Sequence, residues 1–361
     1  MNVIQQILEL ALWTPSGDNQ QTWRFRIEGG TKFSVLAWDT RNHCVYDLDG
    51  RATQIALGAL FENIRIAATQ FGLSPVVRRN EASQIDRYCF AVDLRTEPRL
   101  TRDPLIEQIP LRTVQRRPMR TRRLTDSEKT RIEQATGADH QIHWFESLPI
   151  RLKFAQLLFK SAKLRLTLPE AYATHASVIE WRARFSHEKV PDQAIGMDPI
   201  SARLMEFALV SWQRVRFANR FLGGTFLPRI QLDLLPGLAC AAHLVLAANK
   251  LPQTVEDFMS VGAAWMRAWL TSSALGLYQQ PEMTPLIFSR YARETVPFSA
   301  DADAFARADA IRAAFNELIG ESLAERAVVM ARIGAGPAPI ARSLRRSLSS
   351  MLLAQGEQPP Y

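Results

Sequence analysis

The sequence predicts an α+β fold, and three observations support this prediction. Strand-like segments are few, long apolar helices separate them, and one helix pattern occurs twice along the chain. Strands that do not alternate regularly with helices favour α+β over a doubly wound α/β sheet. Of the 361 residues, 47% are hydrophobic and 22% are charged. These proportions are typical of a globular protein that can bury a large core.

The first hundred residues predict helices at either side of a β-hairpin. A helix is expected over residues 3–13, strands over 22–27, 33–38 and 87–94, and a long buried helix over 51–73. The long helix should stop at Gly72, because glycine readily adopts the left-handed conformation that ends a helix.

The rest of the chain is predicted to be mainly helical. Thr125 should cap a helix over 125–135, with Glu128 completing a capping box. From about 150 to 250 the pattern is mostly helical, including a buried helix over 235–250, and residues 181–199 are its most polar, loop-like part. A second long apolar helix is expected over 257–277, and a strand over 327–334.

One helix pattern is repeated. Residues 58–73 and 262–277 both begin with Gly-Ala and end with Gly-Leu, so Gly58 and Gly72 have the same spacing as Gly262 and Gly276. A glycine inside a helix costs roughly 1 kcal/mol relative to alanine. Its return at the same place indicates close approach of another backbone or of a ligand. We therefore expect a duplication whose two helices cross at their glycines, at the core of an intramolecular pseudo-dimer.

Positive charge is concentrated in two segments. The net charge is +8 and the pI about 9.7. Residues 112–123 hold six arginines and no acid, and residues 341–352 hold three more. Because no nucleic-acid-binding motif surrounds either segment, we expect no nucleic-acid partner. Two interpretations stay open: solvated basic faces, or sites that capture a small anion.

Cysteine and histidine spacing gives no metal site. Cys44, Cys89 and Cys240 lie far apart, which fits neither a disulfide framework nor a zinc site and suits a reducing cytoplasm. The six histidines form no metal-binding pattern; His140 and His143 are expected at a strand edge and His243 in the core. With no signal sequence and no long apolar run, we expect a cytoplasmic protein without a membrane partner.

The stretch PSGDN follows the first helix directly. Its residues all favour turns, so the simplest interpretation is a helix stop before a strand. The segment PSGDNQQTW also matches a P-S-x-x-N-x-Q-P-W pattern at Pro15, Ser16, Asn19, Gln21 and Trp23, with threonine in place of the second proline.

Together with three further motifs, this turn resembles the nitroreductase-like flavoprotein family. Arg112 to Arg116 is similar to the family's arginine motif, although Val114 stands where a hydroxyl is expected. The helix from Gly262 is similar to the family's Gly-Ala helix, and Arg345 begins a segment similar to its C-terminal R-x-P-L element, with serine for proline. The resemblance is closest to the twin-repeat branch, which includes mycobacterial dormancy-associated proteins and proteins labelled as molybdopterin-biosynthesis factors.

The resemblance implies a nitroreductase-like fold made of two fused halves. Residues 1–100 would form the first half and 101–361 the second. Residues 150–235 would be a divergent helical insert, either a lid or a substrate pocket. Because the Pro-Ser turn has no second copy in residues 150–300, one FMN is expected per chain. The chain itself would be a monomer or a dimer of such pseudo-dimers.

The resemblance also implies which residues hold FMN. Arg112, Arg116 and Arg345 would contact its phosphate, with Arg342 and Arg346 as competitors for the last position. The ring would be contacted by four further residues: Pro15, Ser16, Asn19 and Gly262. The implied activity is hydride transfer between NAD(P)H and a small organic substrate, with no catalytic side chain nominated, since the cofactor performs the difficult step. The alternative is an FMN-binding or storage protein with little turnover.

Overall fold

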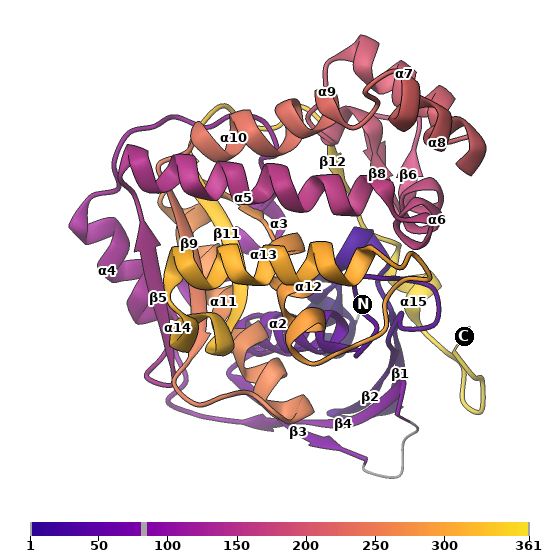
Figure 1. The fold of residues 1–361 in the computed structure, drawn as a ribbon. Helices are drawn as coiled ribbons and strands as arrows, with labels where there is room; N and C mark the ends of the chain where they lie inside the picture. Colours follow the sequence, from indigo (N-terminus) through magenta and orange to yellow (C-terminus); the bar gives the residue numbers. More distant parts are fainter. Residues whose placement is uncertain (1, 81–84, 360–361) are drawn as a thin grey trace.

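The computed structural model describes residues 2–80 and 85–359. They form two four-stranded antiparallel sheets, each accompanied by a long helix, and a helical region that extends from one end of the molecule (Figure 1). None of the helices described is both long and apolar enough to cross a bilayer.

The first sheet has the strand order β1-β2-β4-β3. Its strands are β1 (Trp23–Gly29), β2 (Lys32–Trp38), β3 (Leu73–Arg79) and β4 (Arg87–Thr96). Alternate residues such as Phe33, Val35 and Phe25 point into a core that α1 (Val3–Ala11) and α2 (Arg51–Ala68) complete. The expected helix over 51–73 ends as a 3-10 turn, η2 (Thr69–Phe71), before Gly72 with φ +63°.

The second sheet has the order β10-β11-β9-β5. Its strands are β5 (His140–Phe145), β9 (Ala242–Ala248), β10 (Leu277–Pro281) and β11 (Ala327–Ala335). The expected helix over 235–250 is wrong: only α10 (Leu235–Leu238) is helical there, and β9 follows. Every residue of β9 is buried, so the strand shows no alternation and its sequence resembles that of a buried helix.

The two sheets share one topology. In chain order, both arrange their strands as first, second, fourth, third, and both place a long helix between the second and third strands. That helix is α2 in the first sheet and α11 (Val255–Ala274) in the second. A short helix also precedes each first strand: α1, and α4 (Asp126–Ala135) with the predicted Thr125–Glu128 capping box.

The long helices cross at the predicted glycines. A Cβ on Gly58 would lie 1.9 Å from the Met259 carbonyl oxygen, and one on Gly262 would lie 2.0 Å from the Ile55 carbonyl oxygen. No side chain fits in such a space. The two backbones therefore touch, as the repeated sequence predicted.

Two helical segments complete the second half of the chain. Between β5 and β9 lie α5 (Leu148–Thr167), α6 (Pro169–Val178), α7 (Pro199–Ala208), α8 (Trp212–Phe221) and α9 (Phe226–Arg229), with the short strands β6 (Ile179–Glu180), β7 (Phe185–Ser186) and β8 (Val190–Pro191). Between β10 and β11 lie α12 (Thr284–Arg293), α13 (Ala304–Ile319) and α14 (Glu321–Arg326). Helices α5, α12 and α13 share one apolar core (Figure 1).

The C-terminal segment returns to the first sheet. After β12 (Arg342–Ser343), which pairs with β7, the chain forms α15 (Leu348–Met351). Leu348 and Met351 enter the core of the first sheet, and the Leu353 N–H donates to the Phe25 carbonyl at 2.8 Å. The segment after α3 (Gln108–Leu111) instead reaches the second sheet, where Val114 forms a β-bridge with Gln279 of β10. These crossings bring the two arginine-rich segments to the N-terminal turn.

Candidate functional site

The turn that follows α1 has an unusual backbone. Asp18, Asn19 and Gln21 have positive φ angles of 49°, 62° and 52°. Each non-glycine residue in this region costs on the order of 1–3 kcal/mol. Hydrogen bonds hold it: the Ser16 hydroxyl accepts from the Gln21 N–H, and Gln21 Nε2 donates to the Asn19 carbonyl, both at 3.0 Å. Half-buried Pro15 leads into the turn. Such strain is common at ligand sites.

Asn19 joins the turn to two distant segments. Its Nδ2 lies 3.3 Å from the His187 carbonyl oxygen and 3.2 Å from those of Lys189 and Leu344. Its Oδ1 accepts from Arg345 Nη1 at 3.0 Å. The side chain is buried and fully engaged. Asn19 therefore fixes the position of the turn against the C-terminal arginines.

Arg112, Arg342 and Arg345 form one cluster around Trp13. The Trp13 carbonyl accepts from Arg112 Nη2 at 3.0 Å and from Arg345 Nη2 at 3.4 Å. The Arg342 guanidinium lies 4.7 Å from the centre of the Trp13 ring, and that of Arg112 lies 4.4 Å from the centre of the Trp269 ring. We call these three side chains the arginine cluster. The structure thus brings Arg112 together with Arg345 and with Arg342, which the sequence offered as an alternative to Arg345 for contact with the phosphate. The two segments that supply these arginines are far apart in the sequence.

The charge of the arginine cluster is unbalanced. Burial lowers the pKa of Arg112 well below its ordinary value, and the charges of Arg345 and Arg342 lower it further. The pKa of Arg345 falls to about 9, first through burial and then through Arg342. Within the described residues, Nε of Arg112 and Nε of Arg342 have no hydrogen-bond partner. Buried guanidinium groups with unused donors are suited to a phosphate, which accepts paired N–H groups.

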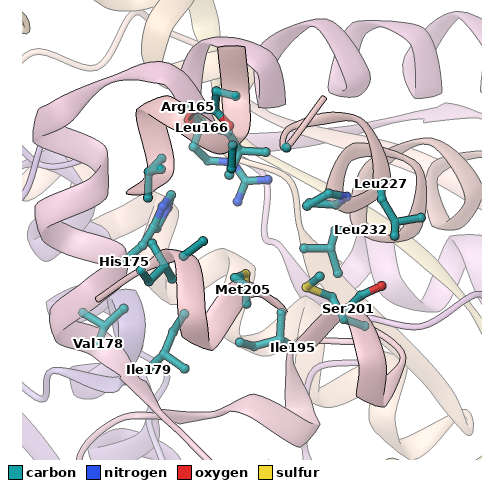
Figure 2. A pocket seen from close by; sticks show the side chains of 18 of the residues that line it. Arg165, Leu166, His175, Val178, Ile179, Ile195, Ser201, Met205, Leu227 and Leu232 are labelled. Carbon is teal, nitrogen blue, oxygen red and sulfur yellow. Dashed lines mark hydrogen bonds between the residues drawn. The ribbon is translucent and has the colours of Figure 1, made fainter. Parts of the chain in front are cut away.

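Next to Asn19, the same turn faces a large cavity of about 1140 Å³. Gly17 and Asp18 line it from the turn, and Pro281 and Met283 line it from the end of β10. Helices α5 to α9 and the loops between them supply most of the remaining wall (Figure 2). That wall is largely apolar and includes Leu166, Val178, Ile179, Ile195, Met205 and Leu232. An apolar cavity with a few polar groups is the usual form of a cofactor or substrate site.

Asp18 and three arginines, Arg116, Arg165 and Arg214, are the charged residues that line the cavity. Arg116 lines it and donates from Nη1 to the Ala194 carbonyl at 3.2 Å; burial lowers its pKa to about 10. Arg165 lies 3.2 Å from Asp233, whose pKa burial raises to about 6. Burial also raises the pKa of Asp18, and the positive charges of Arg116 and Arg165 partly offset this rise. Arg116 is therefore a cavity residue rather than a member of the arginine cluster.

Tyr46 and His175 form a neutral pair in the cavity. Tyr46 Oη lies 3.0 Å from His175 Nε2. Burial, together with the charge of Arg165, lowers the pKa of His175 to about 3, so its ring is neutral at ordinary pH. Burial raises the pKa of Tyr46. Sequence reasoning identified neither residue, because Tyr46 comes from a loop and His175 from α6, far apart in the sequence, and neither belongs to a motif.

Two other predicted positions lie elsewhere. Gly262 sits in the helix crossing, where the Ile55 backbone occupies the space beside it, so the structure gives it a packing role. Arg346 pairs with Glu188 at 3.3 Å instead of joining the arginine cluster. Arg342 and Arg345 are thus the two C-terminal arginines in the cluster.

A buried ion network supports the cavity from the second sheet. Glu282 lies between His243 Nδ1 at 2.7 Å and Arg332 Nη1 at 2.9 Å. His243 Nε2 faces the Gly237 carbonyl oxygen at 2.7 Å, so both ring nitrogens face acceptors. Burial alone lowers the pKa of His243, but the Glu282 carboxylate outweighs it and raises the pKa to about 10. Arg332 also donates to the Arg116 carbonyl at 2.7 Å, which fixes that cavity residue.

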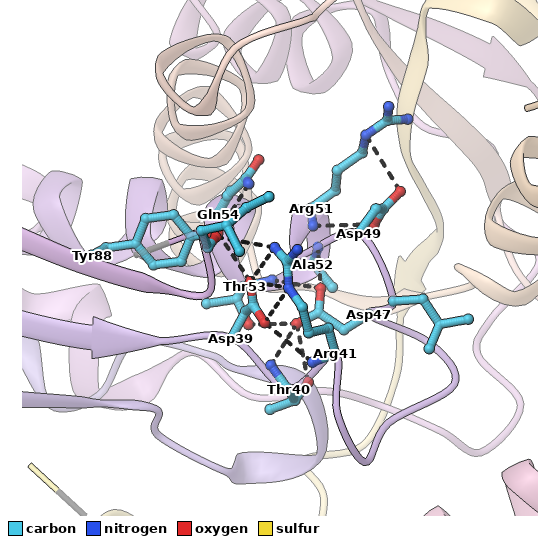
Figure 3. Close-up of polar contacts among 12 residues, drawn as sticks. Asp39, Thr40, Arg41, Asp47, Asp49, Arg51, Ala52, Thr53, Gln54 and Tyr88 are labelled. Atoms are coloured by element: carbon cyan, nitrogen blue, oxygen red, sulfur yellow. Dashed lines mark hydrogen bonds and ion pairs between the residues drawn. The ribbon is translucent and has the colours of Figure 1, made fainter. Parts of the chain in front are cut away.

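A second polar network is structural (Figure 3). Asp47 accepts from the N–H groups of Ala52 and Thr53 at 2.8 and 3.2 Å, which satisfies the first turn of α2. Asp39 pairs with Arg41 at 2.6 Å. These contacts fix the loop over 39–50 and thereby place Tyr46 in the cavity wall.

The solved structures that are similar to this chain are distant, as two of them illustrate. No family model matches the chain, and no curated protein matches it in sequence. A nitroreductase-like family protein from Bacillus cereus is 14% identical with a TM-score of 0.35, over 71% of this chain and 98% of its own. The FMN-dependent nitroreductase NfnB from Mycobacterium smegmatis, solved with NADPH, is 13% identical with a TM-score of 0.36, over 68% and 94%. The function is therefore argued from this chain's own residues.

Proposed function

We propose that this protein is an FMN-dependent oxidoreductase that transfers hydride between NAD(P)H and a small organic substrate. One observation carries the proposal: a strained turn joins the unbalanced arginine cluster to a large apolar cavity. Asn19 contacts the cluster through Arg345, and its neighbour Asp18 lines the cavity. FMN has an anionic phosphate at one end and a largely apolar ring at the other, and the two parts of this site match those ends.

Each part of the site has a defined task in this proposal. Arg112, Arg342 and Arg345 bind the phosphate. Ser16 orients the polar edge of the ring from the turn, Asn19 holds that turn against Arg345, and the apolar wall excludes water. When bound, FMN supplies the hydride chemistry, so no side chain is assigned as a catalytic residue.

We further propose that the chain is a fused pseudo-dimer, with residues 1–100 and 101–361 as its halves. The shared strand order of the two sheets and the glycine crossing of α2 and α11 support this division. The arginine cluster combines Arg112, from the beginning of the second half, with the C-terminal arginines, and it faces a turn from the first half. Because that turn occurs once, one FMN would bind per chain. Residues 150–235 would then be an insert that forms a substrate pocket.

A flavin-storage protein is the second candidate. Helices α5 to α9 supply most of the cavity wall, and such a cover could retain a flavin without admitting a substrate. The two candidates share the binding site and differ in whether the bound flavin can be reduced by a nicotinamide.

The absorbance spectrum of the purified protein separates these candidates. A yellow protein that loses its visible absorbance on anaerobic addition of NADPH or NADH supports the oxidoreductase. A yellow protein that dithionite bleaches and neither nicotinamide bleaches supports storage. A colourless protein that cannot be reconstituted with FMN contradicts both.

A further inference from the structure

Helices α7, α8 and α9 expose an unusual number of large apolar side chains. They project from one end of the molecule (Figure 1). Phe207 is 63% exposed, Phe217 58% and Phe221 64%. Other exposed members are Ile200, Leu204, Val210, Leu222, Phe226 and Leu227. We call this set the apolar crest. Single exposed apolar residues are ordinary, whereas a contiguous group of this kind marks a binding surface.

Arginines surround the apolar crest. Arg203, Arg214, Arg216 and Arg220 are all exposed on α7 and α8. The Arg214 guanidinium lies 4.3 Å from the centre of the Phe207 ring, so cationic and aromatic groups are interleaved. Glu206 is the single acidic residue of these two helices, and it pairs with Arg182 at 3.2 Å. The surface is therefore both apolar and strongly cationic.

The crest is continuous with the cavity. Leu204, Phe207 and Phe217 are exposed to solvent and also line the cavity, as do Leu222 and Leu227. The same side chains therefore belong both to the outer surface and to the cavity wall, so an apolar molecule held at the crest is next to the apolar space of the cavity.

We propose that the apolar crest binds the surface of an anionic lipid bilayer and that the cavity receives a lipophilic molecule from it. Amphipathic helices with aromatic side chains on one face and arginines beside them lie in the bilayer interface. Each cationic side chain near an anionic surface adds to the attraction. The sequence alone predicted no membrane partner, because it contains no apolar run long enough to span a bilayer.

Charge favours a bilayer over a second copy of the chain. A two-fold dimer through the crest would place the same surface against itself. Four arginines of one copy would then face four of the other, and like charges brought together across an interface are unfavourable. Glu206, the single acidic residue of α7 and α8, already pairs with Arg182. Anionic lipid headgroups instead neutralise the arginines while the acyl chains receive the aromatic side chains.

The membrane surface itself does not depend on the proposed flavin chemistry. That this lipophilic molecule is also the substrate of the oxidoreductase rests on the proposed function. Vesicle binding and flavin reduction are measured separately, so failure of one proposal can be distinguished from failure of the other.

Vesicle cosedimentation of the full-length protein tests the proposal. We expect binding to phosphatidylcholine vesicles that contain phosphatidylglycerol, weaker binding to phosphatidylcholine alone, and weakening with salt. The double variant Phe217→Glu/Phe221→Glu should bind at least about tenfold less. Arg216→Glu/Arg220→Glu should lose about fivefold or more for each arginine, and only with the anionic vesicles.

Leu148→Glu is the matched control. Leu148 is 60% exposed at the N-terminus of α5, outside the crest, so its variant should bind vesicles like the wild type. Unchanged melting temperatures show that the variants are folded. Absent binding to either vesicle, or equal binding by the Phe217/Phe221 variant and the control, would overturn the proposal. A dimer that the same double variant dissociates, with no vesicle binding, would overturn it in favour of a second copy.

Discussion

Arg112 is the most deeply buried member of the arginine cluster. It is 3% exposed, its nearest charges are other arginines, and its Nε is unpaired among the described residues. A protein gains no stability from such an arrangement unless an anion joins it, since buried unpaired charges are costly. The residue therefore gives the most direct test of the phosphate site.

Arg112→Ala should weaken FMN binding by about 1.5–3 kcal/mol, the range for a hydrogen bond to a charged group. Riboflavin, which has no phosphate, should bind the variant and the wild type equally well. Isothermal titration with both ligands measures the difference. Exposed Arg117 provides the control, because Arg117→Ala should leave both affinities unchanged. Equal FMN affinity in Arg112→Ala and the wild type would remove Arg112 from the site.

Asn19 should matter for both binding and backbone strain. Replacement by alanine removes the contacts with Arg345 and with the carbonyls of His187, Lys189 and Leu344. In addition, the left-handed conformation at φ 62° destabilises the folded protein by about 1–2 kcal/mol when the residue is alanine, whereas glycine adopts it without this cost. We expect Asn19→Ala and Asn19→Gly to lose FMN affinity alike, with the alanine variant melting at a lower temperature. Unchanged FMN affinity in the glycine variant would contradict a role of this turn in FMN binding and leave PSGDN as a turn that only ends the first helix.

His243 should make stability depend on pH. Its pKa in the folded protein is about 10, above the ordinary value of 6.5, so folding favours the protonated ring. This contribution is complete below about pH 6.5 and decreases as the pH rises toward 10. Urea unfolding at several pH values measures it. In Glu282→Gln the decrease between these limits should be smaller, because the carboxylate that stabilises the imidazolium is gone; an identical slope would contradict the assignment.

The sequence predicted part of the candidate site. Arg112, Arg345 and Asn19 belong to motifs, and the structure places them together. Asp18 lay inside the predicted turn but was assigned no role. Tyr46 and Arg165 could not be found, because the cavity forms from loops and helices that are distant in sequence and have no local signature.

At the scale of elements, local chemistry predicted helices better than strands. The Thr125 capping box is formed as expected, since it depends on neighbouring residues alone. Three strands of the two four-stranded sheets were missed or assigned to a helix. β9 is apolar on both faces, β10 has only five residues, and β3 contains Pro75 with two terminal arginines. Pairing within the sheets, and not local preference, makes these segments strands.

The crossing of α2 and α11 should tolerate no added methyl group. Gly58→Ala or Gly262→Ala places Cβ within 2.0 Å of a backbone oxygen, so the helices must separate. We expect a loss of at least about 2 kcal/mol in the free energy of unfolding, as for overpacked cores. Gly336→Ala is the control, because its nearest neighbour would lie 4.0 Å away. Chemical denaturation that gives all three variants the same stability would show that the crossing is not rigid.

For the whole molecule, the repeated topology has a functional consequence. The turn lies within residues 1–100 and all three members of the arginine cluster lie within residues 101–361, the two halves of the proposed pseudo-dimer. The C-terminal segment then packs its α15 into the first core. A site of this kind would need two subunits if the halves were separate chains. Here one covalent chain supplies all of it.

FMN binding should therefore be independent of protein concentration. A site shared between subunits loses its ligand on dilution, because dissociation of the dimer is coupled to release of the ligand. A site within one chain has no such coupling. We expect a single dissociation constant when FMN is titrated at protein concentrations on either side of any dimerisation constant, with one FMN bound per chain at saturation. Flavin fluorescence, which is commonly altered on binding, measures both quantities. Affinity that weakens on dilution, or saturation at two FMN per chain, would contradict the single intramolecular site and require either a second copy of the chain or a second turn that binds flavin.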